Sequence, residues 1–517
     1  MNDSSESDVI PPASSATWWR RLWEPCDIAS VAFFRVAFAG AMLYHIYLFI
    51  YRNWLYYFYG MTDFHLKYFG FEWVEALDGN GMVQVYVLMA FAAIGVGLGL
   101  FYRLSALVLF LTYTYTFLAE EAMYLDRYYL MSLIAFLLVL IPANRSFSLD
   151  AAIFPEKASS FIPNWCRWVL MFVVALPSVY GGIAKLNSDW LHGMPVGAWI
   201  SMKSDLPVVG PMLTERWAAW VVSYVGLLVD LCIVPLLMWR KTRLVAYFAV
   251  AIFHVMNSLL FSMDVYPGMM ILLTTIFFAP SWPRKLFKRT LTVVSDSIES
   301  TTRTFSQRLT IGIVGLFVIG QLIFPFRHVV YAGNPSWTEE GQQFAWRMML
   351  RRKVVFARFY ATDGVTGTVV EIPYDMMLTE RQIVEVAVSP ERIVEVVPFF
   401  EERAIRTGMK QVEIRAVVIA SLNGRKPQLL IDPDLDLLTV KRTWGHQPWI
   451  KPLTEPFRSE PWDVPSDEWP EVLGIELPEA INPVVDQPPG AAEQGGHDHS
   501  HEGHDHEHTP SRGNAIE

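Results

Sequence analysis

The run Cys166–Trp190, CRWVLMFVVALPSVYGGIAKLNSDW, takes the chain into a membrane. Its first part is almost continuously apolar and is long enough to cross a hydrocarbon core of ~30 Å as a helix. Lys185 comes near the end of this run, where a charge costs about 2.5–3.5 kcal/mol and usually faces the protein interior for a functional reason. A desolvated amine can act as a general base, whereas a lysine that snorkels to the headgroups only anchors the helix. Position alone leaves both interpretations open.

Composition extends this interpretation to most of the chain. With 517 residues, 53% of them hydrophobic, and a mean hydropathy of +0.28, the chain is too apolar for an ordinary soluble enzyme. A polar, Ser-rich leader precedes the first apolar run, which is too long for a signal peptide, so no cleavable signal is expected. Nine apolar spans are predicted, roughly at 28 to 51, 82 to 101, 104 to 119, 128 to 143, 166 to 187, 218 to 239, 243 to 262, 265 to 280 and 309 to 327.

Basic residues predict the orientation. If the N-terminus is cytoplasmic, the inner segments carry fifteen Lys and Arg residues and the outer loops carry four, with Arg127 and Lys185 at span edges left out. This imbalance follows the positive-inside rule. With an odd number of spans, the chain beyond about residue 330 then lies outside the cytoplasm. We therefore expect an integral protein of a bacterial inner membrane with a periplasmic C-terminal domain.

Cysteine usage and net charge exclude other classes. Cys26, Cys166 and Cys232 fall on the cytoplasmic side or in the inner half of a span, so no disulfide is expected. The net charge of −10 reflects an acidic tail. Nucleic acid is therefore not an expected partner.

The periodicity changes after residue 330. Residues 354–361, 368–374, 411–420 and 428–431 alternate or carry β-branched residues as strands do, while 376–405 contains helical stretches. The fold class is thus a polytopic α-helical membrane protein followed by an extracytoplasmic α+β domain and a disordered His-rich tail. The predicted divisions are a polar leader and interfacial anchor at 1–24, a transmembrane domain at 25–330, the α+β domain at 331–455 and the tail at 456–517.

The tail is rich in histidine. Imidazoles alternating with acidic residues can hold a divalent metal ion weakly, but without a folded scaffold they impose no geometry. A dedicated metal-handling role is the alternative, and no tightly bound metal is expected in the active site. The candidate ligands are His497, His499, His501, His504, His506 and His508.

Polar residues of several spans are predicted to meet in the outer half of the membrane. Lys185 ends the fifth span there, Asp126 and Arg127 open the fourth, and the seventh carries His254 and Asn257. A histidine at this depth can donate to an anion or relay a proton, or it can simply bond to a neighbouring helix. Asp126 and Arg127 can equally pair with each other or with headgroups.

Arg35 in the first span and Asp230 in the sixth are predicted to lie nearer the cytoplasmic half and to form structural ion pairs. The chain has no Walker loop, dinucleotide-binding glycine motif, Gly-x-Ser-x-Gly elbow or Cys-x-x-Cys pair. The common soluble chemistries are therefore not expected.

Several of these motifs resemble those of the vitamin K-dependent γ-glutamyl carboxylase family, whose membrane part is called the HTTM domain. The resemblance extends over about residues 25 to 455. It is carried by GGIAKLNSDW at 181–190, FHVMNS at 253–258, LFS at 260–262, WPRKL at 282–286, WRMM at 346–349 and IDP at 431–433.

The resemblance implies a reaction on reduced vitamin K or menaquinol, O2 and CO2. A base deprotonates the hydroquinone, O2 adds, the resulting alkoxide removes a γ-proton from a glutamyl side chain, and the carbanion takes up CO2. Lys185 occupies the position of the family's base, and His254 is the second catalytic candidate. The expected partners are the bilayer, the quinol and a Glu-containing peptide or protein. The candidate binding residues are Asp126, Arg127, Asn257, Asp189, Trp190 and Trp346.

Other functions remain open. Vertebrate members carry an Asn-His pair where this chain has Asp126-Arg127, which keeps open a homologue that oxidises quinol without carboxylating. A transporter would need polar residues in both leaflets, and Arg35 and Asp230 are its only support. A membrane scaffold with a metal-binding tail is the third possibility.

Overall fold

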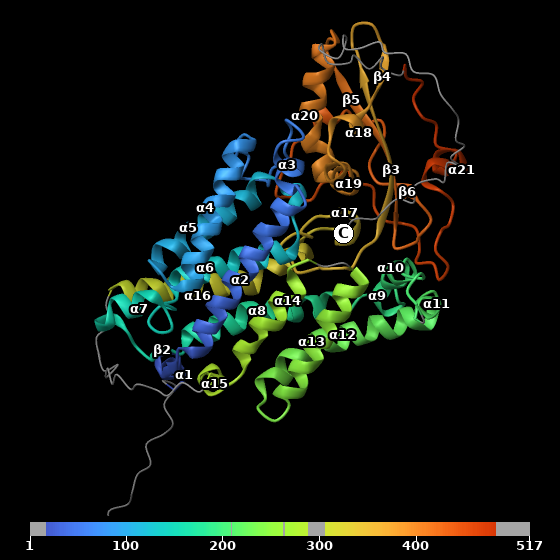
Figure 1. The fold of residues 1–517 in the computed structure, drawn as a ribbon. Helices are drawn as coiled ribbons and strands as arrows, with labels where there is room; N and C mark the ends of the chain where they lie inside the picture. The colour runs from blue at the N-terminus through green and yellow to red at the C-terminus, as the bar shows by residue number, and fades with distance from the viewer. Residues whose placement is uncertain (1–16, 208, 262–263, 288–304, 482–517) are drawn as a thin grey trace, which may run out of the picture.

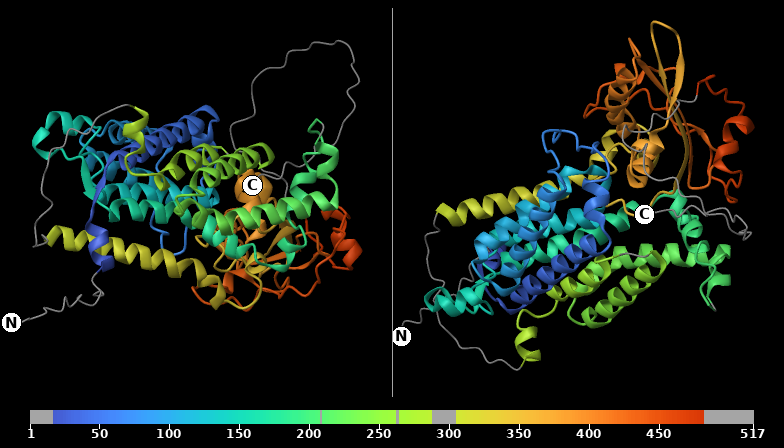
Figure 2. Two further views of the ribbon diagram at one scale, coloured as in Figure 1. Left: turned by 90° about the horizontal axis from the view of Figure 1, so that it is seen from below. Right: turned by 45° about the horizontal axis from the view of Figure 1, so that its top comes forward.

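The protein consists of a helical domain and, at one end of it, a domain built on an antiparallel sheet (Figures 1 and 2). The computed structural model describes residues 17–207, 209–261, 264–287 and 305–481. The sheet domain comes from the C-terminal third of the chain, and we call it the outer domain. The helical domain begins with α1 (Thr17–Trp23).

Six helices of the described residues are long and apolar enough to cross a membrane. Three further helices lie where spans were predicted but are shorter or less apolar: α5 (Tyr102–Ala119), α6 (Asp126–Leu140), and α14 (Tyr266–Leu273) with its continuation η3 (Thr274–Phe277). The 15 residues of α6 extend only about 22 Å. The predicted count of nine spans is therefore not confirmed. The six long helices are α2 (Ala29–Tyr51), α4 (Gly79–Leu98), α8 (Trp165–Ala184), α12 (Arg216–Met238), α13 (Arg243–Phe261) and α16 (Phe305–Ile323) with η4 (Phe324–Val330).

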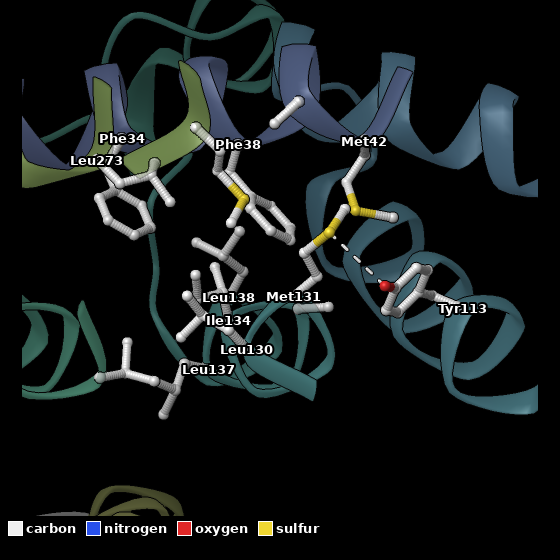
Figure 3. Packing of buried hydrophobic residues seen from close by; sticks show 14 of the residues in the cluster. Phe34, Phe38, Met42, Tyr113, Leu130, Met131, Ile134, Leu137, Leu138 and Leu273 are labelled. Carbon is white, nitrogen blue, oxygen red and sulfur yellow. Dashed lines mark hydrogen bonds between the residues drawn. The ribbon is translucent and has the colours of Figure 1, made fainter. Parts of the chain in front are cut away.

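The short helices complete the core of the helical domain. Figure 3 shows α2 side chains facing α6 across a space filled by leucine, isoleucine and methionine, with Leu273 of α14 beside Phe34. The Tyr113 hydroxyl of α5 donates to the Met131 sulfur at 3.6 Å. Because α6 is surrounded by other helices, it need not match the full thickness of a bilayer. The labelled core residues are Phe34, Phe38, Met42, Tyr113, Leu130, Met131, Ile134, Leu137, Leu138 and Leu273.

Short elements connect these helices at both ends. Near the outer domain, α9 follows directly on Lys185, and η1 joins α5 to α6. The opposite end of the helical domain carries α7, α15 and the antiparallel pair β1–β2 (Figure 1). The bounds are α3 (Trp54–Tyr59), η1 (Glu121–Met123), α9 (Ser188–Leu191), α10 (Val196–Ser201) and α11 (Gly210–Leu213) for one group, and β1 (Pro25–Asp27), α7 (Leu149–Ile153), η2 (Pro155–Lys157), β2 (Phe161–Pro163) and α15 (Trp282–Leu286) for the other.

The outer domain confirms the predicted mixture of strands and helices. Its sheet has the order β4-β3-β5-β6, and every neighbouring pair is antiparallel. Alternate residues of β3 and β5 pack against α19 and α20, as Phe359 and Val418 do, while Tyr360 and Ile419 face the other side. The elements are α17 (Pro335–Thr338), β3 (Lys353–Thr362), β4 (Val369–Ile372), α18 (Tyr374–Met377), α19 (Glu380–Val388), α20 (Pro390–Arg406), β5 (Glu413–Leu422), β6 (Gln428–Leu429) and η5 (Leu437–Thr439).

The prediction of a disordered tail from residue 456 is not confirmed for residues 456–481, which are largely irregular but packed. This segment includes η6 (Ser466–Glu468) and α21 (Trp469–Leu473), and it covers the second face of the sheet. Trp469 is buried there against Tyr360 and Ile419. Proline and acidic residues dominate the segment, but a few large apolar side chains are enough to dock it. The histidine-rich part of the tail lies outside the described residues.

We expect the outer domain to be extracytoplasmic. A Val365→Cys variant in a Cys232→Ser background should react with a membrane-impermeant maleimide in right-side-out vesicles, because Val365 is 64% exposed in the turn between β3 and β4. A Glu156→Cys control, on an exposed residue at the opposite end, should react only after the membrane is opened. The reverse labelling pattern would invert the topology.

Candidate active site

Lys185 forms a buried ion pair with Asp230. Lys185 caps the C-terminus of α8, and its Nζ lies 2.7 Å from Oδ2 of Asp230 in α12. The two side chains are only 8% and 11% exposed. Lys185 therefore points into the protein instead of snorkelling to the membrane surface, and its charge is matched by a carboxylate.

Two glycines of α8 make this pair possible. A Cβ on Gly182 would lie 2.9 Å from Cδ2 and 3.0 Å from the backbone nitrogen of Leu231, so α8 and α12 approach closely at this point. A Cβ on Gly181 would lie 3.5 Å from the Lys185 Nζ and 3.6 Å from the Asp230 Oδ2. Helical side chains lean toward the N-terminus of their helix, so the ammonium group sits a turn below the Lys185 backbone, beside Gly181.

Trp190 forms one wall of the site. Asn187 caps α9 by accepting a hydrogen bond from the Trp190 backbone N–H at 3.0 Å. The indole Nε1 donates to the Ser223 carbonyl of α12 at 2.8 Å, which fixes the ring. The ring centre lies 5.0 Å from the Lys185 Nζ, within the range of a cation–π contact.

Asp189 connects the site to the outer domain. Its two carboxylate oxygens accept from Nη1 and Nη2 of Arg425 at 2.6 and 2.7 Å, and Asn423 Nδ2 donates to Oδ2 at 2.8 Å. Arg425 and Asn423 lie in the turn between β5 and β6. Asp189 was predicted to contact substrate or cofactor, but its oxygens already have protein partners. The structure gives it the role of clamping the outer domain beside Lys185.

A segment of the outer domain enters the helical domain at the same place. Phe344, Trp346 and Met349 all have left-handed backbones, with φ of 56°, 56° and 58°. Such residues cost roughly 1–3 kcal/mol each and persist only where the surroundings impose the conformation. Trp346 is fully buried, and its ring centre lies 5.2 Å from that of Tyr129 in α6. The Trp346 carbonyl lies 3.8 Å from a Cβ placed on Gly181, next to the ion pair.

Asp126 and Arg127 have different partners and do not form an ion pair with each other in the described residues. The Tyr124 hydroxyl donates to Oδ1 of Asp126 at 2.9 Å, and the backbone N–H of Trp346 also bonds to this carboxylate. The Arg127 Nη2 lies 3.9 Å from Oδ2 of Asp264, and the other oxygen of this carboxylate, Oδ1, accepts from Nη1 of Arg52. Asp126 thus faces the Trp346 segment, while Arg127 points toward the start of α14.

His254 and Tyr266 close the remaining side. His254 is buried in α13, with its ring centre 5.7 Å from that of Tyr266 in an edge-to-face contact. Tyr266 in turn lies within electrostatic reach of Asp230, Asp126 and Arg127. In the part of the chain that the structure describes, His254 Nδ1 has no hydrogen-bond partner. Asn257 lies one turn further along α13 and is half-buried.

Part of the predicted group lies around the Lys185–Asp230 pair, whereas Arg127 points toward Asp264. Lys185, Asp230 and Trp346 meet at Gly181, and the Trp190 ring lies beside the Lys185 Nζ. Tyr266 contacts His254 and lies within electrostatic reach of Asp126 and Asp230. Sequence reasoning missed Tyr266, which looks like an ordinary aromatic of an apolar span. It also separated Asp230 from Lys185, although a carboxylate amid an apolar run was a signal for a charged partner.

The predicted ion pair of Arg35 is wrong, whereas the one predicted for Asp230 is present, with Lys185 as the partner. Arg35 donates to the carbonyls of Ala143 and Phe147 at 2.7 and 2.6 Å, so its partners are backbone oxygens. These carbonyls belong to the turn after α6, where the helix leaves acceptors without partners. Asp230 belongs to the Lys185 site.

A second joint connects the two domains through buried charges. Glu120, at the end of α5, accepts from Gln382 Nε2 of α19 at 2.9 Å, and burial raises the pKa of its carboxyl to about 8. The neighbouring Glu121 pairs with Arg392 of α20 at 3.2 Å. Burial raises the pKa of Glu121, while the Arg392 guanidinium opposes that rise. The outer domain is therefore fixed to the helical domain at two separate places.

No group of three or more His, Cys, Asp or Glu side chains suited to a metal ion occurs within residues 17–481, apart from the gaps given above, which were not searched. The tail histidines lie beyond this range. Their predicted weak metal binding stays a prediction.

Six membrane-length apolar helices, with a buried Lys185–Asp230 pair and a clamped outer domain, define an integral membrane protein. Residues 23–282 match the HTTM domain, and residues 306–456 match the lumenal domain of vitamin K-dependent gamma-carboxylase. The chain belongs to the vitamin K-dependent γ-glutamyl carboxylase family. No solved structure is significantly similar to it.

Proposed function

We propose that this protein carboxylates glutamyl side chains of a peptide or protein, using CO2, O2 and a reduced quinone of the vitamin K type. Membership of the carboxylase family supports the reaction class. The buried Lys185–Asp230 pair supports it at the level of residues, because it places an amine inside the membrane domain where a lipid-soluble quinol would arrive.

Lys185 is the proposed base. The base is the neutral amine, which forms when the ammonium group of the Lys185–Asp230 pair releases its proton. Its Nζ then accepts a proton from the quinol hydroxyl, which leaves a quinolate beside the restored ammonium group. The Asp230 carboxylate at 2.7 Å stabilises that ammonium, and Trp190 covers it. Asp230 is thus a positioning residue that also balances charge. The quinolate then reacts with O2. This reaction produces the strong base that removes the γ-proton of the glutamyl side chain.

The described residues around the lysine suit a quinol. Two buried ring nitrogens there, His254 Nδ1 and Trp346 Nε1, have no protein partner within those residues. Buried polar groups normally form hydrogen bonds, so an oxygen-bearing ligand would supply the missing hydrogen bonds of these two nitrogens. Tyr129, Trp346 and Tyr266 supply the aromatic surface that a quinone ring prefers. A peptide substrate would approach from the side of the outer domain, and we propose a bacterial inner membrane with that domain in the periplasm.

The test uses purified full-length protein, reduced vitamin K, a Glu-containing peptide and labelled CO2. We expect label in the peptide together with quinone epoxide. If neither labelled peptide nor quinone epoxide forms, the proposal is refuted.

Epoxide without label would support the second candidate, a quinol oxidase that does not carboxylate. This candidate is favoured by one observation: Asp126 and Arg127 stand where vertebrate members carry Asn-His, and both have protein partners. The transporter alternative loses its support, because Arg35 and Asp230 are occupied by backbone carbonyls and by Lys185.

His254→Ala should lower quinol oxidation by roughly 10²-fold without abolishing it. A nearby imidazole orients or stabilises the anion, whereas the base carries the proton transfer itself. The measurement is kcat for epoxide formation, with His192→Ala as control, since His192 lies outside this cluster with an exposed ring hydrogen bond. Complete loss on His254→Ala in a folded protein would make His254 the essential base.

Removal of residues 495–510 should leave quinol-dependent activity unchanged. The proposed chemistry uses only groups of the helical and outer domains, and a tail that the sequence predicts to be disordered offers a metal no preset geometry. Activity assays and calorimetry with Zn²⁺ on both proteins check this. Stoichiometric submicromolar zinc binding together with inactivity of the shortened chain would favour the metal-handling scaffold.

A further inference from the structure

A cavity of about 730 Å³ lies at the end of the helical domain opposite the outer domain. It is formed by the start of α5, the turn that follows α6, helix α7 and η2. Figures 1 and 2 show α7 projecting at this end, far from the sheet. Because α5 begins and α6 ends here, the cavity sits at the boundary between the apolar helices and water.

Three cations line the cavity. Arg103 starts α5, Arg145 lies in the turn before α7, and Lys157 ends η2; all three are exposed. Arg103 donates through Nη1 to the Val139 carbonyl, which orients its guanidinium and leaves its other N–H groups available. None of the three belongs to an ion pair formed between residues that the structure describes.

The acidic residues of the cavity do not cancel this charge. The Asp150 carboxylate accepts from the backbone N–H groups of Phe101 and Tyr102 at 2.8 and 3.0 Å and from Asn144 Nδ2 at 2.7 Å. It is therefore used to cap the start of α5. Glu156 is the other lining acid, so the cavity keeps a net positive charge.

Large apolar side chains surround the same cavity. Phe101 is 66% exposed, and Leu104 and Phe154 are exposed beside it. The Lys157 Nζ lies 4.9 Å from the centre of the Phe154 ring. A free anion would not contact these apolar side chains. A molecule with a phosphate at one end and hydrocarbon at the other would contact both the cations and the apolar side chains.

We propose that this cavity binds the headgroup of an anionic phospholipid. The phosphate would lie among Arg103, Arg145 and Lys157, and the acyl chains would leave past Phe101 and Leu104 along the apolar face of α5. The volume suits a headgroup and its glycerol, not a whole lipid. Basic pockets between membrane helices commonly hold such headgroups. The proposal is independent of the chemistry at Lys185.

The test is native mass spectrometry of the full-length protein in detergent, titrated with phosphatidylglycerol or phosphatidylcholine. We expect selective retention of phosphatidylglycerol. Replacing Arg103, Arg145 and Lys157 together with glutamine should weaken this binding roughly 100-fold, since each cation near the membrane surface contributes about tenfold or less. An Arg145→Gln/Lys157→Gln variant keeps the Arg103 bond to Val139 and should lose a substantial part of the binding.

The matched control replaces Arg20, Arg240 and Lys241, exposed cations away from the cavity, with glutamine. It removes the same charge and should bind phosphatidylglycerol as the parent does. Equal weakening in both variants would show general electrostatic attraction and overturn the site. Displacement of the lipid by millimolar inorganic phosphate, or equal retention of phosphatidylcholine, would also overturn it.

Discussion

Lys185→Ala is expected to abolish quinol oxidation and therefore carboxylation. Without the amine no group at the site can take the quinol proton at the same position, and general-base catalysis contributes typically 10²–10⁴-fold. The measurement is epoxide formation by purified protein with reduced vitamin K. An amine added in solution is expected to restore part of the activity of this variant by entering the vacated space.

The Lys185→Ala experiment requires a control for folding, because Lys185 is half of the buried Lys185–Asp230 pair. Removing one partner of a buried pair leaves the other charge without compensation and costs about 3–5 kcal/mol. The Lys185→Ala/Asp230→Asn double variant has no such charge, so it should be more stable than Lys185→Ala yet equally inactive. Lys185→Arg should keep the ion pair but not the activity, because a guanidinium stays protonated. Near-normal turnover of Lys185→Arg would mean that only positive charge is needed.

Arg425→Ala should destabilise the docking of the outer domain by about 3–5 kcal/mol, because it leaves the Asp189 carboxylate buried beside Asn423. Thermal unfolding should begin at a markedly lower temperature. Activity should fall as well, since Asp189 and Trp190 share helix α9, and the Trp190 ring covers the Lys185 ammonium.

Two comparisons separate this effect from a general loss of charge. Arg415→Ala removes an arginine whose pair with Glu413 is 44% and 45% exposed, and it should change stability by less than about 1 kcal/mol. The Asp189→Asn/Arg425→Met variant removes both charges and should be more stable than Arg425→Ala. If Arg415→Ala and Arg425→Ala have equal effects, the Asp189 clamp is not what holds the domains together.

Much of the architecture was accessible from sequence because it depends on local patterns. Long apolar runs identified the six membrane-length helices, and alternation in 354–361 and 411–420 identified β3 and β5. The sequence-based predictions failed where the average composition of a segment does not reveal the contacts of its individual side chains. The segment after 456 is rich in proline and acid, yet a few apolar side chains, with Trp469 the most buried of them, hold it on the sheet.

The site was predictable only in part. Lys185 was identifiable because a charge next to an apolar run is costly and needs a reason. Its partner was not, since the depth at which Asp230 meets it depends on the close approach of α8 and α12 at Gly182. Likewise, Arg425 lies 236 residues beyond Asp189 in the chain, and a single sequence carries no signal of that contact.

The insertion of the Trp346 segment between membrane helices has a consequence for biogenesis. The wall of the lysine site beside Gly181 is made by residues translated long after α8, and the clamp on Asp189 is translated later still. Under the proposed function, the helical bundle that first enters the bilayer is thus an unfinished enzyme. Its lysine site is complete only when the outer domain has folded and docked beside Lys185, so activation would wait for the last part of the chain.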